Sequence, residues 1–297
     1  MTIDKGHDMR VSAYALLADP TFLRESIAAY YDHVDRIVVC FDRTSTSWTG
    51  TPLPVDVCRE MVREIDVDGK CVELAGDFSD TARAPLENDT LQRQTALDAA
   101  SDGADWVLQL DTDEVITDAP DFFASLALAD QADADGLDYP SRRLYARISP
   151  GRYLEQCRRF GRVAASFPGP LALRPGAHLR LARQADVPLY RVDFDRRGTD
   201  PWQPRGVEVH RVIDPDRAVL HFSWVRTPDV ILRKFAWSGH APEIEGPAEY
   251  RAWLRRTRHP RIASVLSTFR SSDWLRVAAI PEPPGGDPAE VSGPSAG

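Results

Sequence analysis

The residues best suited to carry chemistry lie in the segment DWVLQLDTDEVI, residues 105–116. An apolar stretch ends there in three carboxylates within four residues, Asp111, Asp113 and Glu114. Like charges crowded this closely repel one another unless a cation lies between them. Carboxylate oxygens suit Mg²⁺ or Mn²⁺, ions that commonly hold substrate phosphates. The segment is therefore a candidate metal site, and the alternative is a solvated acidic turn or a helix N-terminal cap.

A second segment with several chemically capable side chains is AVLHFSWVRTPDVILRKFAWSGH, residues 218–240. His221 and Trp224 fall at a junction between an expected strand and an expected helix, with Lys234 and His240 on or just past that helix. A histidine can complete a metal site made mainly of carboxylates, and a lysine can neutralise phosphate as a point charge. The alternatives are a core histidine, a stacked tryptophan and a solvated lysine.

A third segment, NDTLQRQ at residues 88–94, lies at the start of an expected helix. Helix N-termini attract anions through free N–H groups and the helix dipole. Arg93 could therefore reach a diphosphate or a sugar, and the alternative is an ordinary polar helix face.

The elements that must position these residues alternate along the first part of the chain. Apolar runs predict strands and helical spacing predicts helices, with strands at 10–17, 36–41, 70–74 and 105–110 and helices at 21–31, 54–65 and 87–100. This alternation is typical of a doubly wound, mostly parallel α/β sheet, in which ligands bind beyond the carboxyl ends of the strands. Polar loops at 42–53, 76–85 and 111–118 fit that position.

The second part of the chain has a less regular pattern. We expect strands with irregular connections and then two helices, the strands at 136–147, 171–180, 187–195 and 206–222 and the helices at 227–239 and 247–256. The stretch 281–297 lacks apolar residues to bury, which predicts disorder. The pattern divides the chain into a ligand-binding half, 1–118, an α+β half, 119–275, and a disordered tail, 276–297.

Composition narrows the functional classes. The chain has 297 residues, 43% of them hydrophobic and 27% charged, as in a soluble globular protein. Its net charge of -9 argues against non-specific nucleic-acid binding. No segment has the roughly 18 apolar residues that span a membrane, and the N-terminus lacks a signal core. We expect a cytoplasmic protein, with peripheral membrane association left open. The four cysteines show no CxxC pair and are expected to be reduced thiols.

Together these segments resemble GT-A glycosyltransferases, in particular bacterial family-2-like enzymes. Asp111-Thr112-Asp113 looks like their DxD motif, and Glu114 continues it. Arg36 to Ser47 resembles their nucleotide-binding strand and turn. The HFSW segment with Ile231, Lys234 and His240 resembles the family-17 branch, the β-1,4-N-acetylglucosaminyltransferase-like enzymes. The opening strand departs from the family-2 pattern, because it lacks P-x-x-N/R-E.

The resemblance implies a metal-dependent transfer of a sugar from a UDP or GDP sugar to a carbohydrate or glycoconjugate hydroxyl. Mn²⁺ or Mg²⁺ would lie on Asp111, Asp113 and His221. Donor or acceptor contacts would come from side chains spread along the chain, namely Asp42, Asp77, Arg93, Asp111, Trp224, Lys234 and His240.

An inverting enzyme of this kind also needs a carboxylate base. Candidates are Glu114, Asp193, Asp195 and Glu208, and a retaining mechanism stays open. The alternatives are a nucleotidyltransferase or phosphohydrolase on a similar sheet, or a non-catalytic nucleotide-sugar-binding protein. A Gly-rich basic loop after the first strand would favour a nucleotidyltransferase. Residues 15–25 lack glycine, which argues against that alternative.

Overall fold

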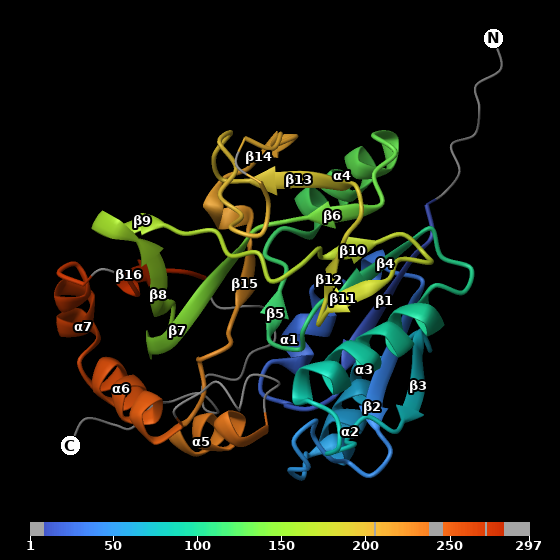
Figure 1. The fold of residues 1–297 in the computed structure, drawn as a ribbon, viewed down its shortest axis with the longest axis horizontal. Coiled ribbons are helices and arrows are strands. Elements are labelled where there is room, and N and C mark those ends of the chain that lie inside the picture. The colour runs from blue at the N-terminus through green and yellow to red at the C-terminus, as the bar shows by residue number, and fades with distance from the viewer. Residues whose placement is uncertain (1–8, 205, 238–245, 271, 282–297) are drawn as a thin grey trace.

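The computed structural model describes residues 9–204, 206–237, 246–270 and 272–281. Figure 1 shows two sheets that lie side by side, with helices around them. The chain builds four strands of the larger sheet first, and its later strands alternate between the two sheets. No helix in the described ranges is long and apolar enough to cross a membrane.

The larger sheet runs in the order β14-β13-β6-β10-β4-β1-β2-β3. Its first-half strands are β1 (Val11–Leu16), β2 (Arg36–Asp42), β3 (Cys71–Gly76) and β4 (Trp106–Gln109). Its later strands are β6 (Gly136–Asp138), β10 (Ala172–Leu173), β13 (Leu189–Asp193) and β14 (Arg211–Val212). Within this sheet β10 runs antiparallel to both of its neighbours, and the other pairings are parallel. The expectation of a mostly parallel α/β sheet is confirmed.

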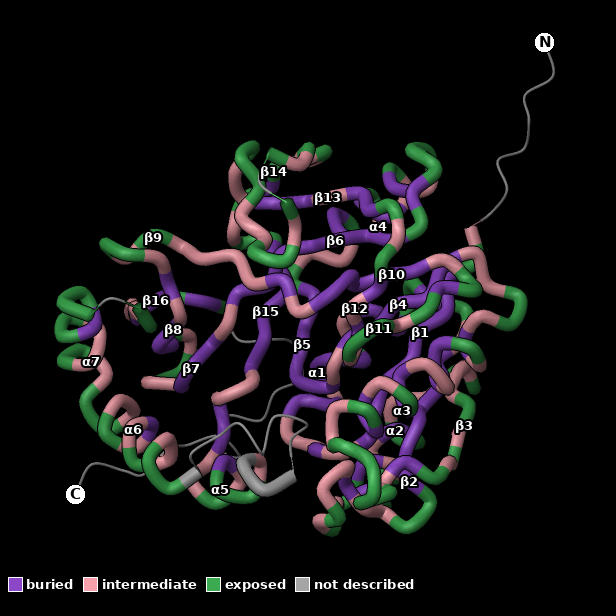
Figure 2. The backbone as a smooth tube through the Cα atoms, in the orientation of Figure 1, coloured by how far each residue is buried: buried purple, intermediate pink, exposed green. Residues whose placement is uncertain are grey.

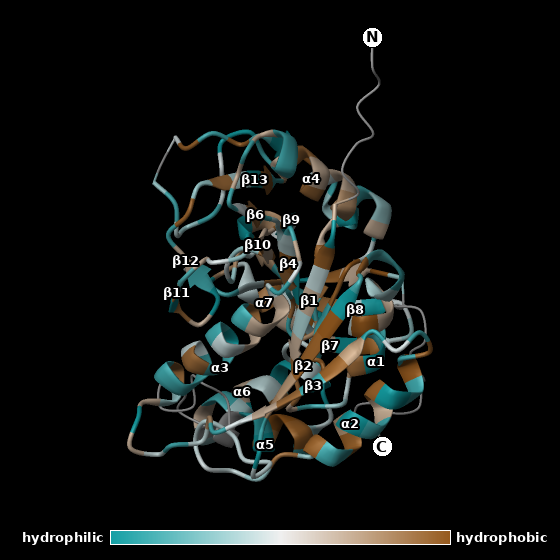
Figure 3. Ribbon diagram, turned by 90° about the vertical axis from the view of Figure 1, so that its right-hand side faces the viewer, coloured by the Kyte–Doolittle hydropathy of each residue, from teal (hydrophilic) through white to brown (hydrophobic). Residues whose placement is uncertain are grey.

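Helices cover both faces of this sheet, so its central strands are apolar on both sides. Ile37 and Val39 of β2 pack in one core cluster with α1 (Leu23–Ala28), α2 (Val55–Ile65) and α4 (Ala119–Gln131). Val38 and Cys40 point the other way and pack with α3 (Pro85–Ala100). Alternate residues of a strand point to opposite faces, so a continuous apolar run is what this position requires. Figure 3 shows the strands largely apolar and the helices mixed.

The order of β1 relative to its neighbours creates a crevice. β1 pairs with β2 on one side and with β4 on the other. The chain leaves β1 toward β2 and β3 and later returns to the opposite side for β4. The loops that follow β1 and β4 therefore diverge at the carboxyl edge, which is where ligands bind in such sheets.

The smaller sheet follows the order β16-β8-β7-β15-β5 and continues from the end of β4. Its strands are β5 (Glu114–Val115), β7 (Ser141–Ser149), β8 (Arg152–Arg158), β15 (Val219–His221) and β16 (Trp274–Ala279), with β9 (Arg162–Val163) paired to β8. A separate hairpin joins β11 (Leu179–Leu181) and β12 (Gln184–Ala185). Since β15 pairs with β5, the acidic segment and the His221 segment lie side by side.

Three helices line the outer side of the smaller sheet, α5 (Pro228–Trp237), α6 (Gly246–Arg258) and α7 (Pro260–Ser267). Single 3₁₀ turns occur at Tyr31–His33, Arg159–Gly161 and Pro215–Arg217. Figure 2 shows buried residues along most strands of the two sheets, and intermediate and exposed residues along β3, α6 and α7.

The first-half elements lie where the sequence predicts them, and the second half differs in several places. The expected strand at 136–147 is two strands, β6 and β7, in different sheets. The expected strands at 171–180 and 206–222 are likewise short pieces. The pattern missed β8, α4 and α7.

The expected tail boundary at 276 is wrong. β16 extends to Ala279 and pairs with β8, because Leu275 and Ala278 are apolar and buried in the cores on either face. Residues 282–297 lie outside the described ranges.

Leu275→Ala tests this strand, because Leu275 is 3% exposed. We expect a loss of about 2–5 kcal/mol in the free energy of unfolding, measured by urea denaturation, as for other buried leucines. Val67→Ala, at a side chain 80% exposed, is the control and should change it by less than about 0.5 kcal/mol. An unchanged midpoint for Leu275→Ala would mean that β16 does not pack.

Candidate active site

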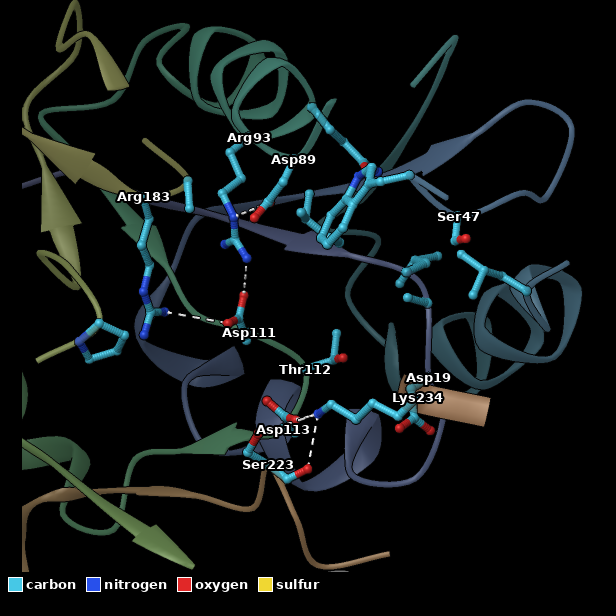
Figure 4. A pocket seen from close by; sticks show the side chains of 18 of the residues that line it. Asp19, Ser47, Asp89, Arg93, Asp111, Thr112, Asp113, Arg183, Ser223 and Lys234 are labelled. Carbon is cyan, nitrogen blue, oxygen red and sulfur yellow. Dashed lines mark hydrogen bonds and ion pairs between the residues drawn. The ribbon is translucent and has the colours of Figure 1, made fainter. Parts of the chain in front are cut away.

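A cavity of about 250 Å³ lies in the crevice at the carboxyl edge of the larger sheet. Its walls come from the ends of β1 and β2, from α3, from the acidic turn after β4, and from the segment between β15 and α5. Figure 4 shows acidic and basic side chains alternating around it. Asp42, Arg93, Asp111, Asp113 and Lys234, all expected at the site, line this one cavity. His221 lines it as well.

Asp113 is a cavity carboxylate with a lysine, an arginine and a histidine beside it. Its Oδ2 accepts hydrogen bonds from Lys234 Nζ at 2.8 Å and Arg226 Nη2 at 3.1 Å. Its Oδ1 lies 3.3 Å from His221 Nε2. Burial raises the pKa of Asp113, but the charges of Lys234, His221 and Arg226 outweigh it and hold that pKa well below its usual range. Asp113 is therefore ionised, and it joins the acidic turn to β15 and α5.

Glu114 is fully buried beneath this turn. Both of its carboxylate oxygens accept hydrogen bonds from Arg183, and Oε2 also accepts one from the Asp111 amide at 3.0 Å. Glu114 does not line the cavity. Its contacts fix Arg183 and the backbone of the turn.

Asp111 faces the cavity from the other side of the turn. Its Oδ1 lies 2.8 Å from Arg93 Nη2, and its Oδ2 lies 4.0 Å from Arg183 Nη1. Burial raises the pKa of Asp111, but Arg93 and Arg183 outweigh it and lower the pKa. With a side chain 30% exposed, Asp111 is open to a ligand in the cavity.

Asp42 ends β2 and orders the loop that follows it. Its Oδ1 accepts a hydrogen bond from the Thr44 amide at 2.9 Å, and its Oδ2 accepts one from the Phe78 amide at 2.8 Å. In the same loop, Trp48 Nε1 donates to Gln92 Oε1 at 2.7 Å. These contacts hold the Trp48 ring and the Asp42 carboxylate at one end of the cavity. A planar ring of a ligand could stack on the tryptophan there.

Several cavity side chains have nitrogens without a hydrogen-bond partner in the described ranges. They are Arg93 Nη1, Arg143 Nε and His221 Nδ1. Arg143 lies beside His221 in the pairing of β7 with β15, and burial lowers the pKa of its guanidinium. Buried donors are costly when they lack an acceptor. Because two of these side chains are arginines, the missing acceptor fits an anionic ligand.

The side chains of the cavity provide some, but not all, of the ligands that a divalent cation needs. Asp113 Oδ1 and His221 Nε2 lie at a spacing that two ligands of one ion can have, 3.3 Å. The described residues contain no group of three or more His, Cys, Asp or Glu side chains arranged around one point. Mg²⁺ is commonly held by one or two carboxylates together with substrate phosphates, so this pair suits an ion that arrives with its substrate.

Asp77 and Trp224, also expected at the site, do not line this cavity. Asp77 has a side chain 80% exposed and pairs with Arg43, and Trp224 stacks on Tyr145. His240 lies outside the described residues.

The other three expected bases lie elsewhere, on β13 and the loop after it. Asp193 accepts a hydrogen bond from Thr199 Oγ1 at 2.9 Å, and Asp195 accepts one from the Arg197 amide at 3.0 Å. Glu208 is exposed. None of the three is among the residues that line the cavity.

The sequence analysis missed several residues of the cavity, among them Asp19, Trp48, Arg143 and Arg183. Arg183 and Arg143 meet the acidic turn through tertiary folding, and no local motif surrounds them. In the sequence, Asp19 precedes a proline and looks like the end of a strand. In the structure its Oδ2 accepts a hydrogen bond from Arg226 Nε at 2.7 Å, a contact that the sequence does not show.

Glu114→Gln tests the buried pair. It leaves Arg183 without its full counter-charge, and we expect a loss of about 3 kcal/mol in the free energy of unfolding by urea denaturation. Glu73→Gln removes an exposed partner of Arg59 and should cost less than about 1 kcal/mol. Equal losses for the two variants would contradict a buried role for Glu114.

No protein-family model and no curated protein matches the chain. The fold is similar to a solved 4-diphosphocytidyl-2C-methyl-D-erythritol synthase from Anaerococcus prevotii, with 10% identity, 56% of this chain and 70% of that chain covered, and a TM-score of 0.33. It is also similar to mannose-1-phosphate geranyltransferase from Thermus thermophilus, with 14% identity, 57% of this chain and 51% of that chain covered, and a TM-score of 0.28. Similarity this low assigns neither a family nor an activity to this chain.

Proposed function

We propose that this protein is a transferase that uses a nucleoside-diphosphate sugar, and specifically a GT-A-type glycosyltransferase. The single observation that carries the proposal is the cavity itself. It lies at the switch point of a mostly parallel sheet, and arginines with unsatisfied nitrogens line it. Ligands of such sheets bind at that point, and arginine is suited to phosphate.

The two ends of the cavity suit the two parts of such a donor. The Asp42 and Trp48 end would take the nucleoside, with the carboxylate accepting from a base or ribose donor. The Arg93, Arg143 and Lys234 end would take the diphosphate. Fixed cationic donors aimed at a leaving diphosphate stabilise the charge that develops on it.

Asp113 and His221 are the residues proposed to hold Mg²⁺ or Mn²⁺, with Asp111 as a further proposed ligand. When bound, such an ion acts as a Lewis acid toward the diphosphate oxygens. Lys234 and Arg226 keep Asp113 ionised, and therefore able to bind a cation. The acceptor is proposed to be a carbohydrate or glycoconjugate.

The direct test of the activity is a panel of nucleotide sugars, read by release of UDP or GDP. Release from one donor would support the proposal. Release of pyrophosphate from a nucleoside triphosphate and a sugar phosphate would instead identify a nucleotidyltransferase and overturn it.

Asp113→Ala separates two roles of that carboxylate. In the wild type we expect UDP or GDP to raise Tm, and Mn²⁺ to raise it further, in a thermal-shift assay. If Asp113 binds the ion, the variant loses the Mn²⁺-dependent part of the rise.

If Asp113 only neutralises Lys234 and Arg226, the variant removes a negative charge beside both cations, and nucleotide should stabilise it more strongly without metal. That second result would contradict the metal assignment. Circular dichroism shows whether the variant is folded, and Asp98→Ala, on the exposed face of α3, is the control.

A further inference from the structure

Helix α7 has the reverse of the usual pattern of a surface helix. Its inward face carries small and polar side chains, Ala263, Ser264 and Ser267. Ser264 Oγ donates a hydrogen bond to the Leu275 carbonyl at 3.1 Å, and Ser267 Oγ accepts one from the Leu275 amide at 2.9 Å. The helix is therefore attached to β16 largely through hydroxyl groups. Surface helices normally bury their apolar stripe instead.

The apolar stripe of α7 and the turn after it faces outward. Ile262, Val265, Leu266 and Phe269 are 57%, 62%, 57% and 84% exposed. Their spacing of three and four residues places them on one side of the helix. Single exposed apolar residues are ordinary, but a contiguous group of large ones marks an interaction surface.

The charge around this stripe is opposite to that of the whole chain. Residues 246–270 contain six arginines against one glutamate, within a chain whose net charge is -9. Five of the arginines are exposed, namely Arg251, Arg255, Arg258, Arg261 and Arg270. Exposed apolar side chains together with exposed arginines on the same helix pair are the pattern of a surface that lies on an anionic bilayer.

We infer that the α6–α7 face, defined by the exposed residues of 251–270, docks on the headgroups of an anionic membrane. Leu266 and Phe269 would enter the boundary between headgroups and acyl chains, while the arginines contact lipid phosphates. A second copy of this chain fits less well, because the same arginines would face one another across a two-fold interface. A nucleic acid also fits less well, because its phosphates and bases provide few apolar contacts for an aliphatic stripe.

This surface is connected to the cavity through neighbouring helices. α5, which carries Lys234, packs on α6, and α6 packs on α7 (Figure 1). Docking would hold the cavity at a fixed distance from the bilayer. The inference does not depend on the proposed function, since it is drawn from the outer face alone.

Vesicle flotation tests the docking surface. We expect wild-type protein to float with phosphatidylcholine vesicles containing phosphatidylglycerol, to float far less with pure phosphatidylcholine, and to be released by high salt. The double variant Leu266→Ser/Phe269→Ser and the double variant Arg258→Glu/Arg261→Glu should each lower binding at least about tenfold.

Matched changes on the opposite side of the molecule are the controls. Val57→Ser/Val67→Ser replaces side chains that are 53% and 80% exposed, and Arg63→Glu replaces an arginine 60% exposed. These should bind vesicles like the wild type.

Three results would overturn the inference. They are no flotation of the wild type with anionic vesicles, equal losses in the controls, or a dimer in sedimentation experiments that the Leu266→Ser/Phe269→Ser variant abolishes.

Discussion

The carboxylate of Asp113 is the contact on which the arrangement of the two halves depends. It belongs to the turn that ends the parallel sheet, yet its partners His221, Arg226 and Lys234 come from the strand and helix more than a hundred residues later. Beneath it, Glu114 joins the same turn to Arg183. The acidic turn is thus where the first half and the second half are held together, and the cavity opens at that junction.

Buried charges are tolerated only when they are paired, and this requirement explains the character of the cavity. Each carboxylate of the acidic turn has at least one arginine, lysine or histidine beside it. Among the described cavity residues, the side-chain nitrogens that lack a hydrogen-bond partner belong mostly to cationic side chains, Arg93 and Arg143. A cavity whose carboxylates are all paired, and in which Arg93 and Arg143 each keep a nitrogen without an acceptor among the described residues, is suited to a diphosphate. The exposed arginines of α6 and α7 present a second, separate surface of the same sign.

Local patterns in the sequence were enough to predict the strands and helices of the first half and some of its cavity residues. Continuous apolar runs such as that of β2 identify buried parallel strands, and polar residues at their carboxyl ends, among them Asp42, Asp111 and Asp113, then fall at the cavity. Lys234 and His221 were found because a helix start follows a short apolar strand.

The rest depends on contacts that no local pattern records. Arg183 reaches Glu114 from a hairpin with no motif, and Arg143 is aligned with His221 only by strand pairing. The strands of the second half are two or three residues long in several places, too short for a periodicity to be visible. α7 was missed although Ile262, Val265 and Leu266 have helical spacing, and the sequence pattern does not show that this stripe faces outward.

The measurement that tests the central claim most directly is calorimetric titration of Arg143→Gln with UDP or GDP and with the matching nucleoside. If the cavity binds a diphosphate through its unsatisfied arginines, the variant should bind the diphosphate about tenfold more weakly, on the order of 1.4 kcal/mol, and the nucleoside unchanged. Arg159→Gln, at an exposed arginine nearby in the chain, should match the wild type. Equal affinity of the wild type and Arg143→Gln for the diphosphate, or equal affinity of the wild type for diphosphate and nucleoside, would contradict the account.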